Sequence, residues 1–318
     1  MLIKDNPSSF LTGYDAFLAL RQVENSAGTY GAGLGFDPHH EGFIGIPHGG
    51  LSMGLCLDLW RRSRNPAYPV DVRFKFGGSG IAIGDSAFLT AESSSTDHGP
   101  GMLVRITKAE DKTPYLSARI APSSAAVPPA VAARPPSPGF RSLPYYRNCF
   151  VCGHHRTVLG LQRRFRLHEE NGSHVVTTLW GHGDDDLDRA DAFLIEADEL
   201  HPAVLISIFD ENTAWGGFMD TRTAGLSVRL DFTLLRPVAK TEKLLFIGRP
   251  AGIRGNPKAP RFFKAEGEIL SLADPQAPEP VAYGSGEWVV LKAYTEQIKS
   301  NLLPEGDWSW IFSSGEDE

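Results

Sequence analysis

The chain has 318 residues and a formal net charge of −7, from 31 Lys and Arg against 38 Asp and Glu. This length predicts about two domains of roughly 150 residues each and excludes a single small module. The mild acidity argues against a general nucleic-acid binder, because such proteins gain most of their affinity by neutralising phosphates with a basic surface. With only 3 cysteines, the chain cannot build a disulfide framework.

The sequence also carries no targeting or membrane signal. No uncharged run approaches the roughly 20 apolar residues that a membrane helix needs. Near the N-terminus, Lys4, Asp5 and Pro7 stand where a signal peptide would have its apolar region. We therefore expect a soluble cytoplasmic protein whose partners include neither nucleic acid nor a membrane.

In the first half, an extended segment over 30–36 and a loop lead to an apolar stretch over 51–60. The length of this stretch predicts a buried helix, and Arg61 and Arg62 at its end are favoured by the helix dipole. Strand-like runs follow over 70–76, 81–93, 102–108 and 115–120.

A proline-rich stretch then divides the chain, with seven prolines between residues 121 and 144. Proline fixes φ and removes a hydrogen-bond donor, so a regular helix or central strand is excluded, and about 24 residues of polyproline II would reach roughly 70 Å. We interpret 121–144 as a linker between a first domain over 1–120 and a second over 145–292, with a C-terminal tail over 293–318. The apolar part of this tail, 308–312, is expected to dock on the body or on a partner.

The second half repeats the order of the first. A strand over 175–180 and an acidic loop over 184–191 precede a helix over 201–215, which opens with a proline that suits the first helical turn. Strand candidates follow over 227–234, 243–249, 262–271 and 282–291. One core helix per half, followed by consecutive antiparallel strands, predicts an α+β fold in which a sheet wraps each helix.

Four segments resemble a known superfamily. The His-Gly-Gly opening at 48–50 resembles the helix start of hotdog-fold acyl-CoA thioesterases of the phenylacetate-pathway type. The second half resembles the same superfamily through Asn-Cys-Phe-Val-Cys-Gly at 148–153, Leu-Gly-Leu at 159–161, and a helix led by His201. The resemblance implies two tandem hotdog domains, over roughly 30–120 and 146–292, that form an intramolecular pseudo-dimer.

Thioester hydrolysis needs an electrophilic group for the acyl oxygen and a carboxylate that delivers water. Gly49 and Gly50 at a helix N-terminus suit the first role, because free N–H groups and the positive end of the dipole polarise a carbonyl. In the enzymes that the sequence resembles, a carboxylate lies nine residues after the motif histidine, which is roughly 13 Å along the helix. The acid must therefore act on a substrate held by a neighbouring antiparallel helix.

Applied to both halves, this spacing predicts one composite site. Leu57 stands nine residues after the first motif histidine, with Asp58 one place further, whereas Asp210 stands nine residues after the second, followed by Glu211. The second helix has Pro-Ala where the first has Gly-Gly, so it has lost one N–H. We therefore predict that the glycine pair faces Asp210, with Glu211 and Thr213 beside it, and that the opposite pairing is impaired or silent.

The predicted catalytic residues are Asp210, Glu211, Gly49 and Gly50. The expected substrate-binding residues are His48, Thr213, Asp58 and His201, together with three cations for the phosphates of coenzyme A: Arg254, Lys258 and Arg261. Coenzyme A enters as part of the substrate, and no separate cofactor is expected. His48 could equally be a structural helix cap.

A metal site is not predicted, although one motif leaves the question open. Cys149-x-x-Cys152 next to His154-His155 has zinc-ligand chemistry. A single such pair beside two adjacent histidines is poorly arranged for one ion, and we interpret the segment as a structural turn.

The function implied by the resemblance is a thioesterase-like hydrolase of acyl-CoA or carrier-bound acyl thioesters. One alternative is a hotdog hydratase or dehydratase, for which Asp198 and His201 lie close in sequence but lack the surrounding pattern. Another is a non-catalytic double hotdog that binds an acyl ligand or serves in assembly. Sheet edges and helix faces are the surfaces through which a homo-oligomer would form.

Overall fold

The computed structural model describes residues 21–312, with gaps at 27–28, 44, 64–66, 79, 97–98, 125–138, 157–159, 171, 192, 197, 257–258 and 307. Most of the predicted linker, Lys258 and the end of the tail lie outside the described residues. The division of the chain at 121–144 therefore stays a prediction.

The described part of the first half forms one long helix and six strands. The long helix is α2 (Gly49–Ser63), preceded by the short η1 (Pro38–His40); the strands are β1 (Arg21–Ser26), β2 (Thr29–Gly35), β3 (Val70–Phe76), β4 (Ser86–Thr96), β5 (Gly99–Lys108) and β6 (Pro114–Pro122). β3 alternates buried and more exposed side chains, as a strand with one face on a core should.

The second half repeats this plan with a longer helix, α4 (Pro202–Thr221). Around it lie β7 (Arg141–Ser142), β8 (Tyr145–Tyr146), β9 (Arg166–Glu170), β10 (Ser173–Trp180), α3 (Asp184–Asp191), β11 (Leu194–Glu196), β12 (Glu199–Leu200), β13 (Gly225–Leu234), β14 (Leu244–Asn256), β15 (Ala259–Ser271), β16 (Glu279–Val290), α5 (Lys292–Lys299) and β17 (Leu302–Leu303). Residues 202–219 of α4 are all buried, which explains why its sequence is apolar on every side.

The acidic segment 184–191 corrects one expectation, because it forms the helix α3 and not a loop. Asp186 anchors this helix: it is buried, its Oδ2 accepts a hydrogen bond from the Gly181 amide at 3.0 Å, and it pairs with the Arg163 guanidinium. A buried, paired carboxylate therefore holds α3 against the sheet.

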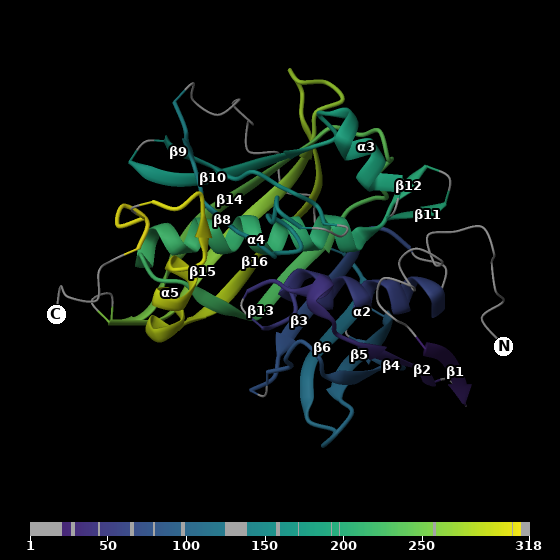
Figure 1. The fold of residues 1–318 in the computed structure, drawn as a ribbon. Helices are drawn as coiled ribbons and strands as arrows, with labels where there is room; N and C mark the ends of the chain where they lie inside the picture. The colour runs from purple at the N-terminus through teal and green to yellow at the C-terminus, as the bar shows by residue number, and fades with distance from the viewer. Residues whose placement is uncertain are drawn as a thin grey trace.

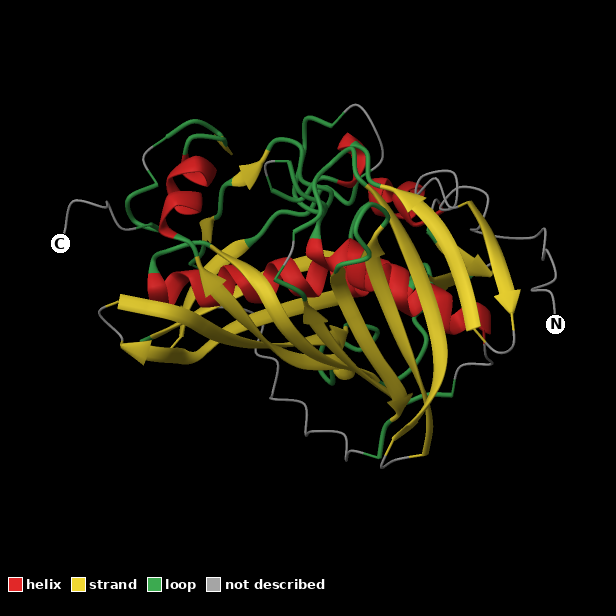
Figure 2. Ribbon diagram, turned by 90° about the horizontal axis from the view of Figure 1, so that it is seen from below, coloured by secondary structure: helices red, strands yellow, loops and turns green. Residues whose placement is uncertain are grey.

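A single antiparallel sheet of 13 strands joins the two halves, in the order β1-β2-β4-β5-β6-β3-β13-β16-β15-β14-β10-β9-β7. The halves meet where β3 pairs with β13, with Phe74 opposite Leu230 and Val72 opposite Phe232. Figure 1 shows the two helix-plus-sheet units side by side, and Figure 2 shows the strands curving around one side of the two long helices. The predicted α+β plan, a core helix wrapped by an antiparallel sheet in each half, is the observed one.

The helices α2 and α4 are antiparallel and pack through small residues. A Cβ added to Gly50 would lie 2.4 Å from the Cα of Ser207, and one added to Gly54 would lie 2.5 Å from the Cβ of Ala203. Larger side chains would separate the backbones, so these residues set both the closeness and the register of the pair.

The tail returns to the body of the molecule. Ile311 and Phe312 are buried, and the Phe312 ring packs against Trp215 and Phe218 of α4. Among the described helices, none combines the length and hydrophobicity that crossing a membrane requires.

Candidate functional site

His48 caps the N-terminus of α2. Its amide donates to the His40 carbonyl at 2.8 Å, and its Nδ1 accepts the Gly50 N–H at 3.1 Å. The other ring nitrogen, Nε2, therefore points across the helix pair, where it lies 3.2 Å from Oε2 of Glu211 on α4. His48 is thus a structural cap and a site residue at the same time.

Cys149 reaches the same carboxylate from the turn after β8. Its Sγ lies 3.1 Å from Oε2 of Glu211 and accepts the backbone N–H groups of Val151 at 3.3 Å and Cys152 at 3.4 Å. The Phe150 amide donates to the Glu41 carbonyl at 2.7 Å, which fixes this turn to the loop before α2. A segment of the second half therefore completes a cluster at the helix start of the first.

Asp210 occupies the N-terminus of α2 from the opposite helix. Its Oδ1 accepts a hydrogen bond from Ser227 Oγ at 2.9 Å, and a Cβ added to Gly49 would lie 3.0 Å from its Oδ2. Burial raises the pKa of Asp210, while His48 and the Ser227 hydroxyl act in the opposite direction. The predicted meeting of Gly49, Gly50 and Asp210 across the helix pair is what the structure contains.

Opposing effects act on the pKa values of His48 and Cys149. Burial disfavours the charged form of His48, but Cys149 and Glu211 raise its pKa to about 10. The Gly50 amide works against this increase, because Nδ1 can accept its N–H only when unprotonated. Burial also raises the pKa of Cys149, but hydrogen bonding to Cys152 and His48 holds it below its usual value.

A second cluster at the other end of the helix pair repeats this geometry. His201 caps α4 by accepting the Ala203 N–H on Nδ1 at 2.9 Å, and its Nε2 lies 3.0 Å from Oδ1 of Asp58. The other oxygen of Asp58 is 2.6 Å from the Arg62 guanidinium. His201 and Asp58 are buried and Arg62 is partly exposed, so within this cluster the charge of Asp58 is balanced by that of Arg62.

Comparing the two clusters corrects the sequence alignment of the acids. Asp58 and Glu211 each follow their own capping histidine by ten residues and each bind the histidine of the other helix. Asp58 is therefore the counterpart of Glu211, and not a displaced copy of Asp210, whose counterpart is Leu57. One turn further, Arg62 corresponds to Trp215.

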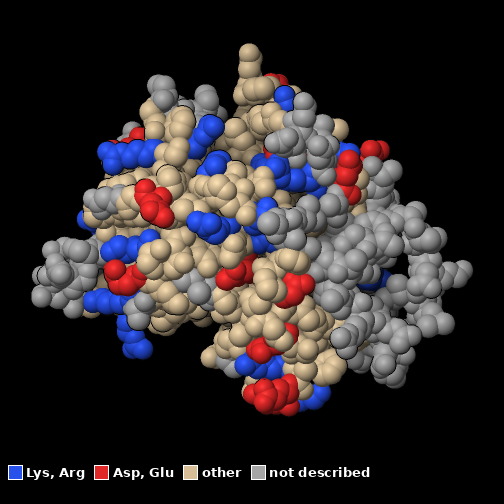
Figure 3. Space-filling model, in the orientation of Figure 1, with Lys and Arg blue, Asp and Glu red and all other residues tan. Residues whose placement is uncertain are grey.

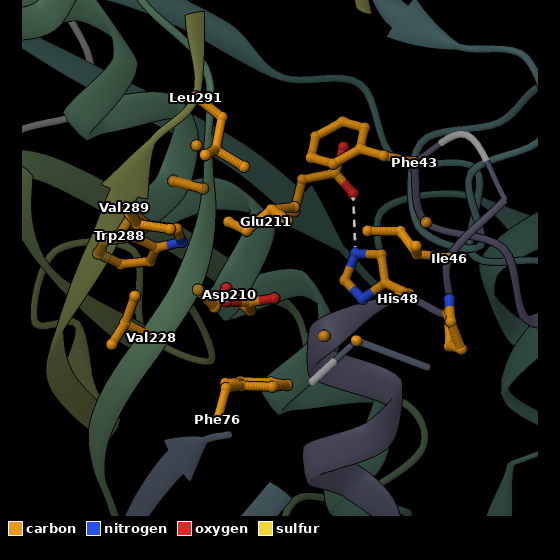
Figure 4. Close-up of a pocket in the computed structure, with 18 of the residues that line it drawn as sticks. Phe43, Ile46, His48, Phe76, Asp210, Glu211, Val228, Trp288, Val289 and Leu291 are labelled. Atoms are coloured by element: carbon orange, nitrogen blue, oxygen red, sulfur yellow. Dashed lines mark hydrogen bonds and ion pairs between the residues drawn. The ribbon is translucent and has the colours of Figure 1, made fainter. Parts of the chain in front are cut away.

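A cavity of about 580 Å³ opens beside the first cluster. His48, Asp210 and Glu211 form its polar end, while Trp288, Phe76 and other aromatic and aliphatic side chains form its walls, as Figure 4 shows. An apolar chamber with a few convergent polar groups is the usual form of a small-molecule site.

Five of the predicted residues gather at the polar end of the cavity, and two predicted cations lie on the strands beyond it. Gly49, Asp210, Glu211 and His48 line the cavity, and Gly50 lies directly behind them with its amide on His48. Arg254 stacks over Phe262 at the cavity wall, 4.0 Å from the ring centroid, and Arg261 is exposed on the neighbouring strand.

Three expectations are corrected. The Thr213 hydroxyl donates to backbone carbonyls of its own helix, that of Phe209 at 2.7 Å and that of Asp210 at 3.1 Å, and its methyl group faces Gly267 of β15, so the hydroxyl is not directed at the Asp210 carboxylate. Asp58 and His201 bind each other in the second cluster. None of the three residues lines the cavity.

The zinc arrangement considered from sequence does not assemble among the described residues. His155 Nε2 lies 2.9 Å from the Tyr145 hydroxyl, and the His154 ring packs on the same tyrosine. Cys149 faces Glu211, on the other side of the turn.

Sequence reasoning missed Cys149 and Ser227 as site residues. Cys149 belongs to the Cys-x-x-Cys motif, so the sequence contains a signal for it, although the motif by itself predicts only a structural turn. Ser227 lies on β13, 17 residues beyond Asp210, and no local pattern marks it.

Basic side chains are concentrated elsewhere. In the view of Figure 3, Lys and Arg gather on the upper half of the molecule. A second, smaller cavity of about 310 Å³ is lined by Arg163, Arg164, Arg166 and Arg189. Arg163 and Arg189 pair with Asp186, and the other two stack on Tyr145 and Phe140, so internal contacts account for this group of charges.

No protein-family model and no curated protein sequence matches this chain. Solved structures, in contrast, match it over most of its length. A tesB protein of Mycobacterium avium subs paratuberculosis is 12% identical with a TM-score of 0.55, covering 89% of this chain and 100% of that one. A protein of Novosphingobium aromaticivorans that carries the provisional name thioesterase is 16% identical with a TM-score of 0.53, covering 86% and 98%.

The dehydratase domain from the CurJ module of curacin polyketide synthase is similar to the same extent. It is 12% identical with a TM-score of 0.53, and the match covers 86% of this chain and 96% of that domain. Identities this low show a shared fold. The predicted fold of two hotdog units in one chain is thereby confirmed.

Proposed function

We propose that this protein hydrolyses acyl thioesters at the composite site between its two hotdog units. The observation that carries the proposal is the position of Asp210, a buried carboxylate that faces the N-terminus of α2 from the other helix at the polar end of an apolar cavity. The tesB and other thioesterase-named structures share this fold, which makes the proposal consistent with the comparisons.

The chemistry follows from the geometry. The thioester carbonyl would lie against the first amides of α2, where Gly49 allows close approach and the helix dipole stabilises a developing oxyanion. Asp210 would take a proton from a water molecule while the oxygen of that water forms a bond to the carbonyl carbon. Collapse of the tetrahedral intermediate breaks the C–S bond, and the departing thiolate takes up the proton from Asp210.

Ser227 has a positioning role in this scheme. Its hydroxyl donates to Oδ1 of Asp210, which turns Oδ2 toward Gly49 and the cavity. Burial raises the pKa of Asp210 and so makes it a stronger base than an exposed aspartate.

The cavity indicates the substrate class. Its aromatic and aliphatic walls suit an apolar acyl group. Arg254 stacks on the cavity residue Phe262 and pairs with Glu287 through Nε at 3.1 Å, and its terminal N–H groups are the ones we assign to a phosphate of coenzyme A or of a carrier arm.

A second candidate is supported by the pair of His48 and Glu211. A histidine and a carboxylate 3.2 Å apart on the cavity wall could move protons in the addition of water to an enoyl thioester or its removal. The pair considered from sequence, Asp198 and His201, does not serve this purpose, because His201 binds Asp58.

A panel of acyl-CoA and enoyl-CoA thioesters tests these proposals, with a thiol-trapping reagent and enoyl absorbance followed together. We expect thiol release that falls about 10²–10⁴-fold in Asp210→Asn, the usual cost of losing a general base. Asp220→Asn, an exposed position on the same helix, is the matched control.

Three other outcomes would contradict parts of this proposal. Thiol release that Asp210→Asn leaves unchanged contradicts the role of this residue. A change in enoyl absorbance without thiol release favours the hydratase reaction, and saturable binding without turnover favours a ligand-binding protein.

A further inference from the structure

Glu211 and the two side chains beside it form a cluster of potential metal ligands that the proposed hydrolysis does not use. His48 Nε2, Cys149 Sγ and a carboxylate oxygen of Glu211 all lie within 4.8 Å of one another. They come from the start of α2, the turn after β8 and the middle of α4, and their exposed fractions are 6%, 1% and 6%. A fold that brings three different donor types from three segments to one buried point requires an explanation.

Two of the three donor separations are close to those of a tetrahedral metal site, and the third, between Nε2 and Sγ, is within 4.8 Å. Zinc bonds of about 2.0–2.3 Å to nitrogen, oxygen and sulfur imply ligand atoms about 3.3–3.6 Å apart. The observed separations are 3.2 Å between Nε2 and Oε2 and 3.1 Å between Sγ and Oε2. A small outward movement of each atom would admit an ion.

The turn that holds Cys149 favours a thiolate ligand. Its Sγ accepts two backbone N–H groups, from Val151 and Cys152, and such bonds stabilise negative charge on sulfur. Cys152 borders this cluster, since its thiol interacts with Cys149 and Glu211, but its Sγ also accepts the Tyr146 N–H at 3.4 Å and is not one of the three converging donor atoms.

The second cluster contains an arginine that has no counterpart in the first. This residue, Arg62, lies 2.6 Å from Asp58 and balances its charge. The corresponding position next to Glu211 is Trp215, which lines the cavity and carries no charge. A buried carboxylate with a thiol neighbour gains most from a positive ion at this place.

The same residues could instead form a nucleophilic triad, but their geometry is unsuitable. In a triad the imidazole uses one nitrogen for the nucleophile and the other for the acid. In this cluster Nδ1 of His48 is engaged by the Gly50 amide, and both Cys149 and Glu211 lie on the Nε2 side. Three ligand atoms that converge on one point suit a metal ion, whereas a proton relay needs its partners on opposite nitrogens of the imidazole.

We propose that His48, Cys149 and Glu211 bind a divalent transition-metal ion of the zinc class. All three residues line the cavity, so the fourth coordination position opens onto it and would hold water. Binding through Nε2 moves the ring proton to Nδ1, and the Gly50 amide must then leave this nitrogen for the Asp210 carboxylate, which lies at the same helix end.

Metal binding can be measured without any assay of hydrolysis, so its failure and the failure of the proposed function are separate results. The purified full chain would be stripped with a chelator and titrated with Co²⁺, while the sulfur-to-cobalt charge-transfer band and the visible bands of tetrahedral cobalt are recorded. We expect one equivalent of Co²⁺ per chain, displaced by Zn²⁺.

The variants assign the ligands. Cys149→Ser should abolish the charge-transfer band, and Glu211→Gln should weaken Co²⁺ binding at least tenfold. Cys56→Ser, a buried cysteine within α2, and Cys152→Ser should keep the band. Circular dichroism verifies that each variant is folded.

Two outcomes would overturn the proposal. One is a wild-type chain that binds no Co²⁺ or Zn²⁺ in the micromolar range, a result that depends on no variant. The other is a charge-transfer band that survives Cys149→Ser in a folded protein.

Discussion

Two adjacent carboxylates on α4 have different surroundings. Consecutive helical residues point about 100° apart, so neighbours in sequence can face different partners. Asp210 meets Ser227 and the start of α2, whereas Glu211 meets His48 and Cys149. This separation allows one residue to act on a substrate while the other holds the cluster together.

The contribution of Ser227 can be measured directly. A hydrogen bond to a charged group is worth about 1.5–3 kcal/mol, so Ser227→Ala should lower kcat for thiol release by roughly 10- to 100-fold with little change in KM. Ser227→Thr keeps the hydroxyl and should restore most of the rate.

Ser117→Ala, on the exposed face of β6, is the control for a simple loss of hydroxyl. If Ser227→Ala has the wild-type kcat, the hydroxyl does not position Asp210.

At the scale of elements, the helix pair decides which residues meet. Gly50 and Gly54 of α2 lie against Ser207 and Ala203 of α4. This register brings each capping histidine opposite the acid ten residues into the other helix. The contact between small residues is therefore the structural basis of the composite site.

Gly54→Ala tests the closeness of the helices. Alanine is favoured over glycine in a helix by about 1 kcal/mol, but the new Cβ would lie 2.5 Å from that of Ala203. Overpacking costs about 1–3 kcal/mol, so we expect a net loss of unfolding free energy in urea titrations.

Gly35→Ala is a suitable control, since a Cβ there meets no atom within 4 Å. A Gly54→Ala protein as stable as the wild type would show that the helices can separate at no cost.

The second cluster predicts how stability depends on pH. Burial opposes ionisation of Asp58, but His201 and Arg62 hold its pKa below the usual value; burial lowers the pKa of His201. Both groups bind protons more readily when the chain is unfolded. The stabilisation is therefore complete at neutral pH, and the free energy of unfolding decreases as the pH is lowered. The decline begins near the ordinary histidine pKa of about 6.5 and steepens below about 3.9.

Urea midpoints measured between pH 8 and pH 2 would follow this decline. Asp58→Asn removes the carboxylate that Arg62 and His201 share and should cost about 2–4 kcal/mol at pH 7, with a flatter limb below about pH 3.9 than the wild type. Glu92→Gln, at an exposed ion pair with Arg105, should leave the profile unchanged. A steeper acid limb in Asp58→Asn than in the wild type would contradict the expected direction.

At the scale of the whole molecule, the two units share their main structural surfaces. The sheet continues from β3 into β13, and α2 packs along α4. The cavity draws its walls from both halves, and the tail adds Phe312 behind Trp215. Neither unit contains a complete site without the other.

This sharing predicts cooperative unfolding. Cys56 is buried in the first unit, and Trp180, Trp215 and Trp288 are buried in the second. Trp60 is buried in the first unit, so fluorescence is recorded on a Trp60→Phe variant. Labelling of Cys56, located by mass spectrometry, and tryptophan fluorescence of this variant should give the same midpoint in a urea titration. Two separated midpoints would show that the units unfold independently.

The sequence by itself predicted the two long helices and the main strands that follow them, the two copies of one plan, and the pairing of Gly49 with Asp210. These features follow from hydrophobic periodicity and from the positions of helix starts, which are local properties of the chain. The distance along a helix also showed that the acid must act across the pair.

Only the tertiary structure decided which side chains complete the site. Cys149 and Ser227 come from a turn and a strand, and no spacing in the sequence relates them to α4. The equivalence of Asp58 with Glu211, and of Arg62 with Trp215, depends on the register between two packed helices. That register is fixed by close contacts between small residues, and such contacts exist only once the chain has folded.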